Sequence, residues 1–226
     1  MNVDNNWSSV ADLFSGLMII FLFIAIAMMI ETKKESAQVE LLKEDLKTLA
    51  SSYDADKEFF YKLLQEEFSN DFSKWNAQLD KDLTIRFNNP DILFKSGSSE
   101  ISDEFKVILK SFWPRYIRIV SLYKEKISHV SLEGHTSSFW CKKCSDEFSY
   151  FNNMKLSQER SYEVLKWCWS QSNDKEVIKE MVVATGLSYS RLIKEDGVEN
   201  SELSKRVEFS LKLNAEKVIS KMKKDN

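Results

Sequence analysis

The stretch WSSVADLFSGLMIIFLFIAIAMMIE, Trp7 to Glu31, is the most apolar part of this 226-residue chain, and residues 10–30 within it contain a single charged side chain, Asp12. Those 21 residues correspond to ~31 Å of α-helix, about the hydrocarbon thickness of a bilayer. A signal peptide would need basic residues before the apolar run and a small-x-small cleavage site after it, and neither is present. The sequence therefore predicts an uncleaved transmembrane helix over residues 10–30, preceded by a short tail over residues 1–9.

The position of Asp12 needs an explanation, because an ionised carboxylate costs ~2.5 kcal/mol or more at the centre of a membrane helix and less near its end. Small or polar residues lie about one turn before and after it on the same side of the helix, namely Ser8, Ser9, Ser15 and Gly16. Asp12 either marks the helix start, where the macrodipole favours an anion, or faces a partner helix and carries ions. We favour the second interpretation, which requires further helices from another subunit, because one span cannot enclose an ion path.

Residues 31–79 form a predicted helical connector without a strong helix breaker. Its apolar positions are spaced alternately three and four apart, with one acidic interruption, which is typical of a heptad seam. The seam consists of Val39, Leu42, Leu46, Leu49, Tyr53, Asp56, Phe60 and Leu63. Two interpretations stay open: an amphipathic helix packed on its own domain, or a parallel dimeric coiled coil continuing from the membrane span.

From about residue 80 the chain alternates between strand and helix patterns. Alternating apolar residues predict strands at DLTIRFN (82–88), ISHVSLEGH (127–135), MVVATG (181–186) and KRVEFSLKLN (205–214). Helices are predicted over 102–126, with Ser102 as N-cap, and over 151–171. This order is typical of an α/β sandwich with helices on one face of the sheet. A short basic tail, residues 216–226, closes the chain.

The cysteines and the lack of recognisable catalytic patterns limit the functions that we expect of the chain. Cys141 and Cys144 form a C-x-x-C pair, which is half a zinc site at most. In an oxidising compartment the pair would form a disulfide, which we favour, and in a reducing one it would be two thiols. Cys168 lies between two tryptophans and is predicted to be a core thiol. No nucleophile–base arrangement, phosphate loop, complete metal site or basic stripe is visible, so we expect no enzyme, cofactor, metal or nucleic-acid partner.

Four segments, in order, resemble the OmpA-like peptidoglycan-binding domain. They are ILFKSGSSEIS, ISHVSLEGHTSS, NNMKLSQERSYEVLKW and LSKRVEFSLKLN. The family pattern has an F-x-x-G segment, a strand ending in G-H-T-D, a helix start N-x-x-L-S-x-x-R-A and a strand N-R-R-V-E-F. The resemblance covers about residues 80–215, and it implies a βαβαββ sandwich that binds the peptide stem of peptidoglycan.

The resemblance also implies which residues bind. Arg160 would receive the diaminopimelate carboxylate of the stem, since a guanidinium can grip a carboxylate with two hydrogen bonds. Other matching or adjacent positions are Thr136, Asn152, Asn153 and Leu156. The chain departs from the pattern at Ser137, where the family has an aspartate that contacts the ligand's amine. Asp146 and Glu147, in a long loop before the helix, are candidates for the missing carboxylate.

Taken together, the two halves resemble MotB-type stator subunits of rotary motors, in which a tryptophan-then-aspartate segment like W-S-S-V-A-D opens the span. The short tail and connector resemble most the MotB-like subunits of Zorya anti-phage defence systems. The resemblance implies a homodimer inside a ring of a MotA-like (ZorA-type) partner, with protons passing Asp12 and the wall-binding domain holding the dimer still. It implies the bacterial inner membrane, a cytoplasmic N-terminus and a periplasmic C-terminal domain.

One observation opposes this orientation. No lysine or arginine precedes the span. Four lysines follow it, namely Lys33, Lys34, Lys43 and Lys47. The positive-inside rule would place the segment after the span in the cytoplasm. We favour the orientation that the domain resemblance implies, because these lysines are mixed with glutamates. The alternative function is a passive inner-membrane tether that binds peptidoglycan without conducting ions, and it leaves Asp12 without a role.

Overall fold

The computed structural model describes residues 4–88, 90–95 and 97–214, and the chain divides into two compact units between Ser51 and Ser52. The predicted basic tail and the first three residues of the predicted N-terminal tail lie outside the described residues. The first helix, α1, spans Asp4–Trp75 and contributes to both units. Within the first unit every side chain of residues 10–30 is exposed. Among the described residues, α1 is the one helix that is long and apolar enough to cross a membrane.

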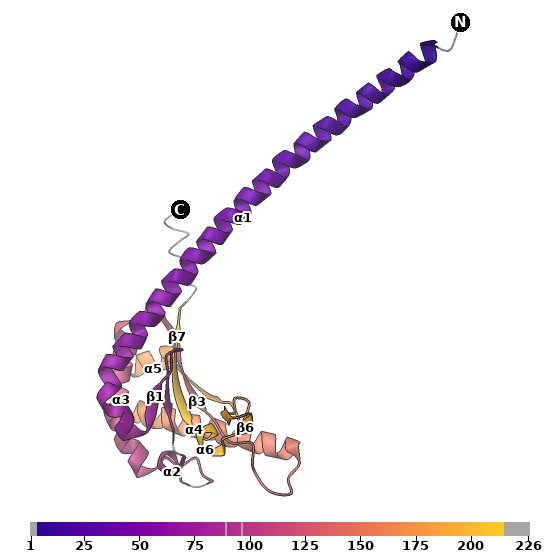
Figure 1. Ribbon diagram of the computed structural model, residues 1–226. Helices are drawn as coiled ribbons and strands as arrows, with labels where there is room; N and C mark the ends of the chain where they lie inside the picture. The colour runs from indigo at the N-terminus through magenta and orange to yellow at the C-terminus, as the bar shows by residue number, and fades with distance from the viewer. Residues whose placement is uncertain (1–3, 89, 96, 215–226) are drawn as a thin grey trace. The chain divides into compact units, whose positions relative to one another are not determined.

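The second unit contains a five-stranded mixed sheet with helices between its strands (Figure 1). The strands are β1 (Ala77–Leu79), β2 (Thr84–Phe87), β3 (Ile127–Gly134), β4 (Val182–Gly186), β5 (Lys194–Glu195), β6 (Val198–Glu199) and β7 (Val207–Leu213). The helices after α1 are α2 (Pro90–Leu93), α3 (Asp103–Leu122), α4 (Asp146–Gln171), α5 (Lys175–Met181) and α6 (Ser201–Ser204). The sheet order is β1-β2-β7-β3-β4, in which only β3 and β4 pair in parallel, while β5 and β6 form a separate hairpin.

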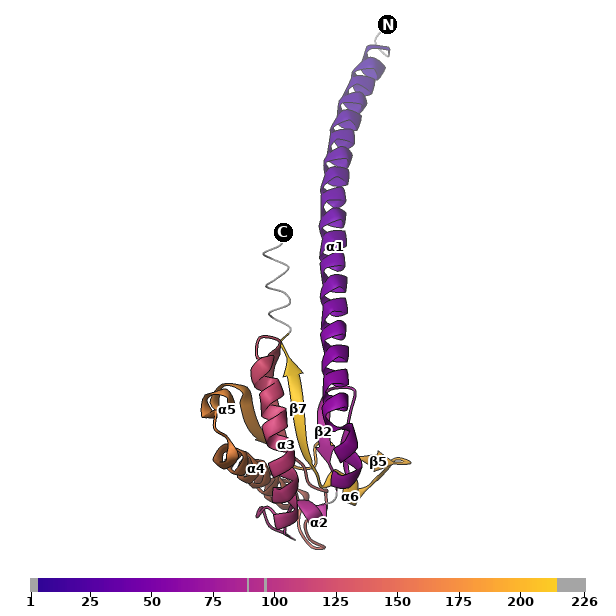
Figure 2. The same ribbon diagram turned by 90° about the vertical axis from the view of Figure 1, so that its left-hand side faces the viewer.

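One face of the sheet is apolar, because side chains alternate between the two faces of a strand. Phe87 of β2, Leu132 of β3 and Phe209 of β7 lie on this face and are buried. The Phe209 ring contacts Phe112 of α3 edge to face, with ring centroids 4.9 Å apart, and α3 lies alongside β7 (Figure 2). The opposite face carries polar residues that are also buried, including Ser131 and the two glutamates described below.

The end of α1 belongs to this core. Phe60, Leu64 and Phe68 recur every four residues on one side of the helix and are fully buried, as expected of an amphipathic helix packed on its own domain. Arg115 of α3 ties α3 to α1 through ion pairs of 2.7 Å with Glu67 and 2.7 Å with Asp71. Upstream, the seam positions Val39, Leu42 and Leu46 are exposed. The packed-helix interpretation therefore describes the last turns of α1, and the dimeric interpretation remains a prediction for the upstream part.

The predicted fold class is confirmed: β2, α3, β3, α4, β4 and β7 follow the βαβαββ order. Ser102 caps α3 as predicted, since its hydroxyl accepts a hydrogen bond from the backbone N–H of Phe105 at 3.0 Å. Cys168 is buried in the core as predicted. Five elements were not predicted, because all of them are too short to show a clear periodicity: β1, α2, α5, α6 and the β5–β6 hairpin.

Candidate functional site

The helix α4 lies directly on the ends of β3 and β4, and two glycines make this close approach possible. A Cβ atom on Gly134 would come within 2.2 Å of the Ser157 carbonyl oxygen, and one on Gly186 within 2.4 Å of the Gln158 backbone nitrogen. Any side chain at either position would therefore push α4 off the sheet. The glycine of the G-H-T segment thus fixes the distance between the strand end and the helix that carries Arg160.

Ser188 fastens the strand end to α4. This buried residue has φ near 50°, in the left-handed region that non-glycine residues rarely adopt. Its N–H donates to the Ser157 hydroxyl at 2.9 Å, and its carbonyl accepts from the N–H of Thr136 at 2.9 Å. These hydrogen bonds hold an unfavourable backbone conformation in place and join Thr136 to the helix one turn from Arg160.

Arg160 is a buried cation without a carboxylate partner among the described residues. It is 7% exposed, its Nε donates to the Ser98 carbonyl at 3.0 Å, and its guanidinium lies 4.7 Å from the centre of the Phe94 ring. Burial lowers the pKa of Arg160 to about 10, because a low-dielectric environment disfavours the charged form. The side chain still carries its charge near neutral pH. Because burial has already removed most of its water, binding of an anion would cost little further desolvation of the guanidinium.

The other predicted binding residues occupy different environments. Asn153 and Thr136 are buried, and the Asn153 Nδ2 and Thr136 Oγ1 atoms lack a hydrogen-bond partner within the described chain. Asn152 instead donates to the Phe148 carbonyl of its own helix at 2.8 Å. Leu156 is half-buried and Ser137 is buried. The structure thus brings Thr136, Asn153 and Arg160 to one side of α4, with donor and acceptor groups left unused.

The geometry of α4 separates Asp146 and Glu147 from Arg160. Both acids lie in the exposed first turn of the helix, 14 and 13 residues before Arg160, which is ~20 Å along a helix axis. Neither can contact the same small ligand centre as Arg160. The suggestion that one of them replaces the aspartate missing at Ser137 is therefore wrong on geometric grounds.

A different carboxylate contacts Ser138, the residue after Ser137. The N–H of Ser138 donates to Glu199 Oε1 at 2.9 Å, and the Ser138 hydroxyl donates to the other carboxylate oxygen. Glu199 belongs to β6, far from Ser138 in sequence. Because β5 and β6 have only two residues each, their pattern gave no signal, although the Asp196-Gly197 pair between them is typical of a tight hairpin turn.

The loop between Ser138 and α4 is closed by a disulfide. Cys141 and Cys144 are joined, with their Cα atoms 5.5 Å apart, within the usual range for such a bond. Ser145 then caps α4, accepting a hydrogen bond from the Phe148 N–H at 3.2 Å. The long loop is therefore anchored just before α4 begins.

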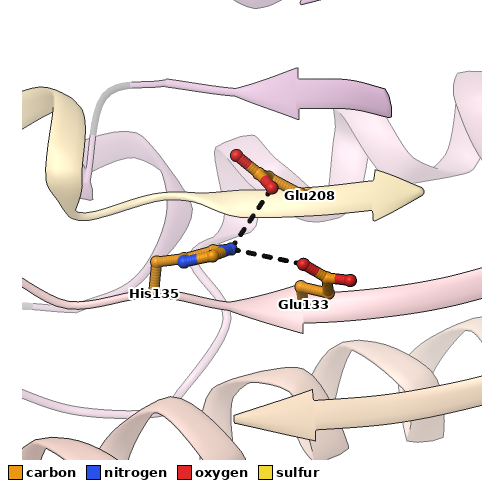
Figure 3. A group of neighbouring side chains, drawn as sticks. All are labelled: Glu133, His135 and Glu208. Atoms are coloured by element: carbon orange, nitrogen blue, oxygen red, sulfur yellow. Dashed lines mark ion pairs between the residues drawn. The ribbon is translucent and has the colours of Figure 1, made fainter. Parts of the chain in front are cut away.

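A buried charge network occupies the polar face of the sheet (Figure 3). His135 Nε2 lies 3.7 Å from Glu133 Oε2 and 3.3 Å from Glu208 Oε2, and all three side chains are almost fully buried. Arg191 pairs with Glu133 at 2.9 Å, and Arg206 pairs with Glu208 at 2.6 Å. Burial alone would raise the pKa of Glu208, but His135 and Arg206 outweigh it and hold that pKa well below its usual range.

This cluster offers three ligand atoms that lie within 4.8 Å of one another, which a metal ion would accept. The charges argue against that use. Arg86 also pairs with Glu208, at 2.7 Å, so three guanidiniums already neutralise the carboxylates, and a divalent cation would be repelled. The group is better explained as an ion-pair network of three guanidiniums and two carboxylates that links β2, β3 and β7.

The predicted ion-carrying residue lies in the first unit. Asp12 is part of α1, and the hydroxyl of Ser15, one turn later, donates to the Ala11 carbonyl at 2.8 Å. The space beside Gly16 is open, with no atom within 4 Å of a Cβ placed there. Ser8 and Ser9 are helical, and their side chains lie outside the described part of the structure.

Comparisons with known proteins give consistent results. The chain matches no protein-family model. It is 37% identical over 224 residues to the Zorya protein ZorB of Escherichia coli (strain Crooks), covering 97% of this chain and 92% of the relative. The crystal structure of a putative MotB-like protein from Desulfovibrio vulgaris has 19% identity and a TM-score of 0.54, covering 73% of this chain and 98% of that one. The periplasmic domain of Helicobacter pylori MotB has 16% identity and a TM-score of 0.43, covering 63% and 85%.

The second unit of this chain has the fold of a MotB-like protein, and a long apolar helix precedes it. The 37% identity to ZorB over 97% of this chain identifies its family more closely than the fold does. The chain belongs to the family of the Zorya protein ZorB.

Proposed function

We propose that this chain is the wall-anchored stator subunit of a proton-driven, MotA/MotB-like membrane motor in a Zorya-type anti-phage defence system. Two copies would sit inside a ring of a MotA-like (ZorA-type) partner in the bacterial inner membrane. The N-terminus would be cytoplasmic and the second unit periplasmic, bound to peptidoglycan. Family membership supports the MotB-like role, and the buried, unpaired Arg160 supports recognition of an anionic wall peptide.

Asp12 is the observation that carries the motor interpretation. It is the single ionisable residue between Val10 and Ile30, in a helix whose remaining side chains there are almost all apolar. Proton binding would neutralise Asp12 and remove the cost of holding a carboxylate in the membrane, and proton release would restore it. Each exchange would change how the helix packs against the surrounding ring, and the ring would turn around a subunit fixed to the wall.

The test is Asp12→Asn, expressed with its partner subunits in cells challenged by phage. We expect loss of protection, with unchanged co-purification of the MotA-like partner and unchanged retention on isolated peptidoglycan sacculi. Asp45→Asn is the matched control, since it makes the same chemical change at an exposed position beyond the span. Full protection by Asp12→Asn would refute ion conduction and leave the passive tether as the function.

A further inference from the structure

The disulfide between Cys141 and Cys144 lies on the surface of the second unit. Cys141 is exposed and Cys144 is half-buried. The loop that contains them projects from the rest of the unit together with the first turns of α4 (Figure 1). A thiol can therefore reach the bond, and above all the Cys141 sulfur, without any opening of the fold. Exposed disulfides of this kind are the labile or catalytic ones, whereas structural disulfides resist reduction.

The fold does not depend on this bond. On the strand side, the N–H and the hydroxyl of Ser138 both donate to Glu199, and on the helix side Ser145 caps α4. Both anchors lie outside the ring that the disulfide closes. The two cysteines are only three residues apart, and short loops gain the least stability from a cross-link. The reduced form should therefore keep the fold, as a site that cycles between two redox states must.

The charges near the pair can stabilise a thiolate. Lys142 and Lys143 lie between the two cysteines and are exposed. The helix α4 begins two residues after Cys144, and a helix N-terminus and nearby lysines both stabilise a thiolate. Asp146 and Glu147 in the first turn of α4 carry the opposite charge. Since the two lysines offset these two acids, the helix N-terminus remains to stabilise a thiolate at Cys144.

We propose that Cys141 and Cys144 form a thiol–disulfide exchange site for a dithiol partner protein. A thiolate of the partner attacks Cys141 Sγ and forms a new S–S bond, while the bond to Cys144 breaks and its electron pair leaves on Cys144 Sγ. The second thiol of the partner, after losing its proton, attacks the partner's own sulfur in this mixed disulfide and releases Cys141 as a thiolate. The partner loses two electrons and two protons, and the two cysteines gain them. Exchange frees residues 139–144, and the anchors on either side stay in place.

The first test follows reduction of the folded, full-length protein in detergent by dithiothreitol, a dithiol that stands in for the partner. Samples are alkylated at intervals and analysed by mass spectrometry, while circular dichroism monitors the fold. We expect Cys141 and Cys144 to be reduced with the circular dichroism unchanged, and Cys168, which is buried, to stay unmodified. Reduction that occurs only in urea concentrations that unfold the domain would overturn the proposal, because the disulfide would then be structural.

The direction of exchange is tested with reduced glutathione, whose single thiol stops the reaction at the mixed disulfide. After an acid quench, we expect about tenfold more glutathione on Cys141 than on Cys144, because attack goes to the accessible sulfur and the better-stabilised thiolate leaves. Equal amounts on the two cysteines would overturn the roles assigned to them.

The part played by the lysines is tested by the double variant Lys142→Gln/Lys143→Gln, which should be reduced about threefold more slowly than the wild type, as removal of exposed charges near a thiolate does. The matched control is Lys110→Gln/Lys124→Gln, which removes the same charge at exposed positions outside the loop and should react at the wild-type rate. Equal rates for the two double variants would overturn the stabilisation of the thiolate by the loop lysines. None of these outcomes depends on wall binding or ion conduction.

Discussion

Because of Glu208, the stability of the domain should fall at low pH, and a single substitution can test this. The folded state keeps this carboxylate ionised to lower pH than the unfolded chain does, because His135 and Arg206 stabilise its charge. Below about pH 4.5, the usual value for glutamate, the unfolded chain therefore binds more protons, and stability falls as the pH falls. Above that range the contribution of Glu208 is fully present.

We expect Glu208→Gln to lower the free energy of unfolding by about 3 kcal/mol at pH 7, because it leaves Arg86 and Arg206 without their shared partner. The variant should also lose less stability than the wild type between pH 5 and pH 3. Urea unfolding at several pH values measures both effects. Equal pH slopes for the two proteins would show that Glu208 does not titrate as the network predicts.

The residues of the site differ in how far the sequence revealed them. Arg160, Asn153 and Thr136 stand in recognisable motifs, and the structure buries all three. Glu199 stands in no motif, because its contact with Ser138 depends on a hairpin that returns to the strand end from a distant part of the chain. Motifs record local segments, whereas a contact of this kind comes from a segment that folds back from elsewhere in the chain.

At the scale of secondary structure, long periodic segments were predictable and short ones were not. The helix α3, with its capping serine, and the strand β7, with its strict alternation, appear where the sequence placed them. The strand β1 has only three residues, and it exists because it pairs with β2 across a tight turn that ends at Leu83, which has positive φ. Such an element is stabilised by tertiary pairing that no local pattern contains.

The upstream part of α1 and its last turns should respond differently to substitution. Phe68→Ala should lower the free energy of unfolding of the second unit by about 3–5 kcal/mol, the usual cost of emptying a buried aromatic site, since Phe68 is fully buried against Phe112. Leu42→Ala, at an exposed seam position, should leave that stability unchanged and weaken self-association. Chemical unfolding and sedimentation in detergent measure the two quantities, and undiminished association of Leu42→Ala would exclude the seam as a dimer contact.

For the whole molecule, the cysteines report the compartment of the second unit without any added probe. Disulfides persist in oxidising compartments and are reduced in the cytoplasm. If the unit is periplasmic, a maleimide added to denatured, unreduced cell extract should modify only one of the three cysteines, Cys168, and all three after reduction. Modification of all three without reduction would place the domain in the cytoplasm, against the wall-anchored orientation and in agreement with the lysines that follow the span.

The unpaired Arg160 has a consequence for the turnover of the protein in the cell. A ligand that binds only the folded domain raises its stability by mass action, and here it would also supply the anion that a buried cation lacks. Copies that have found the wall should therefore open less often than copies that have not. Because proteases degrade proteins through their open states, unattached subunits should be degraded first, and the population of subunits in the membrane would become enriched in anchored ones.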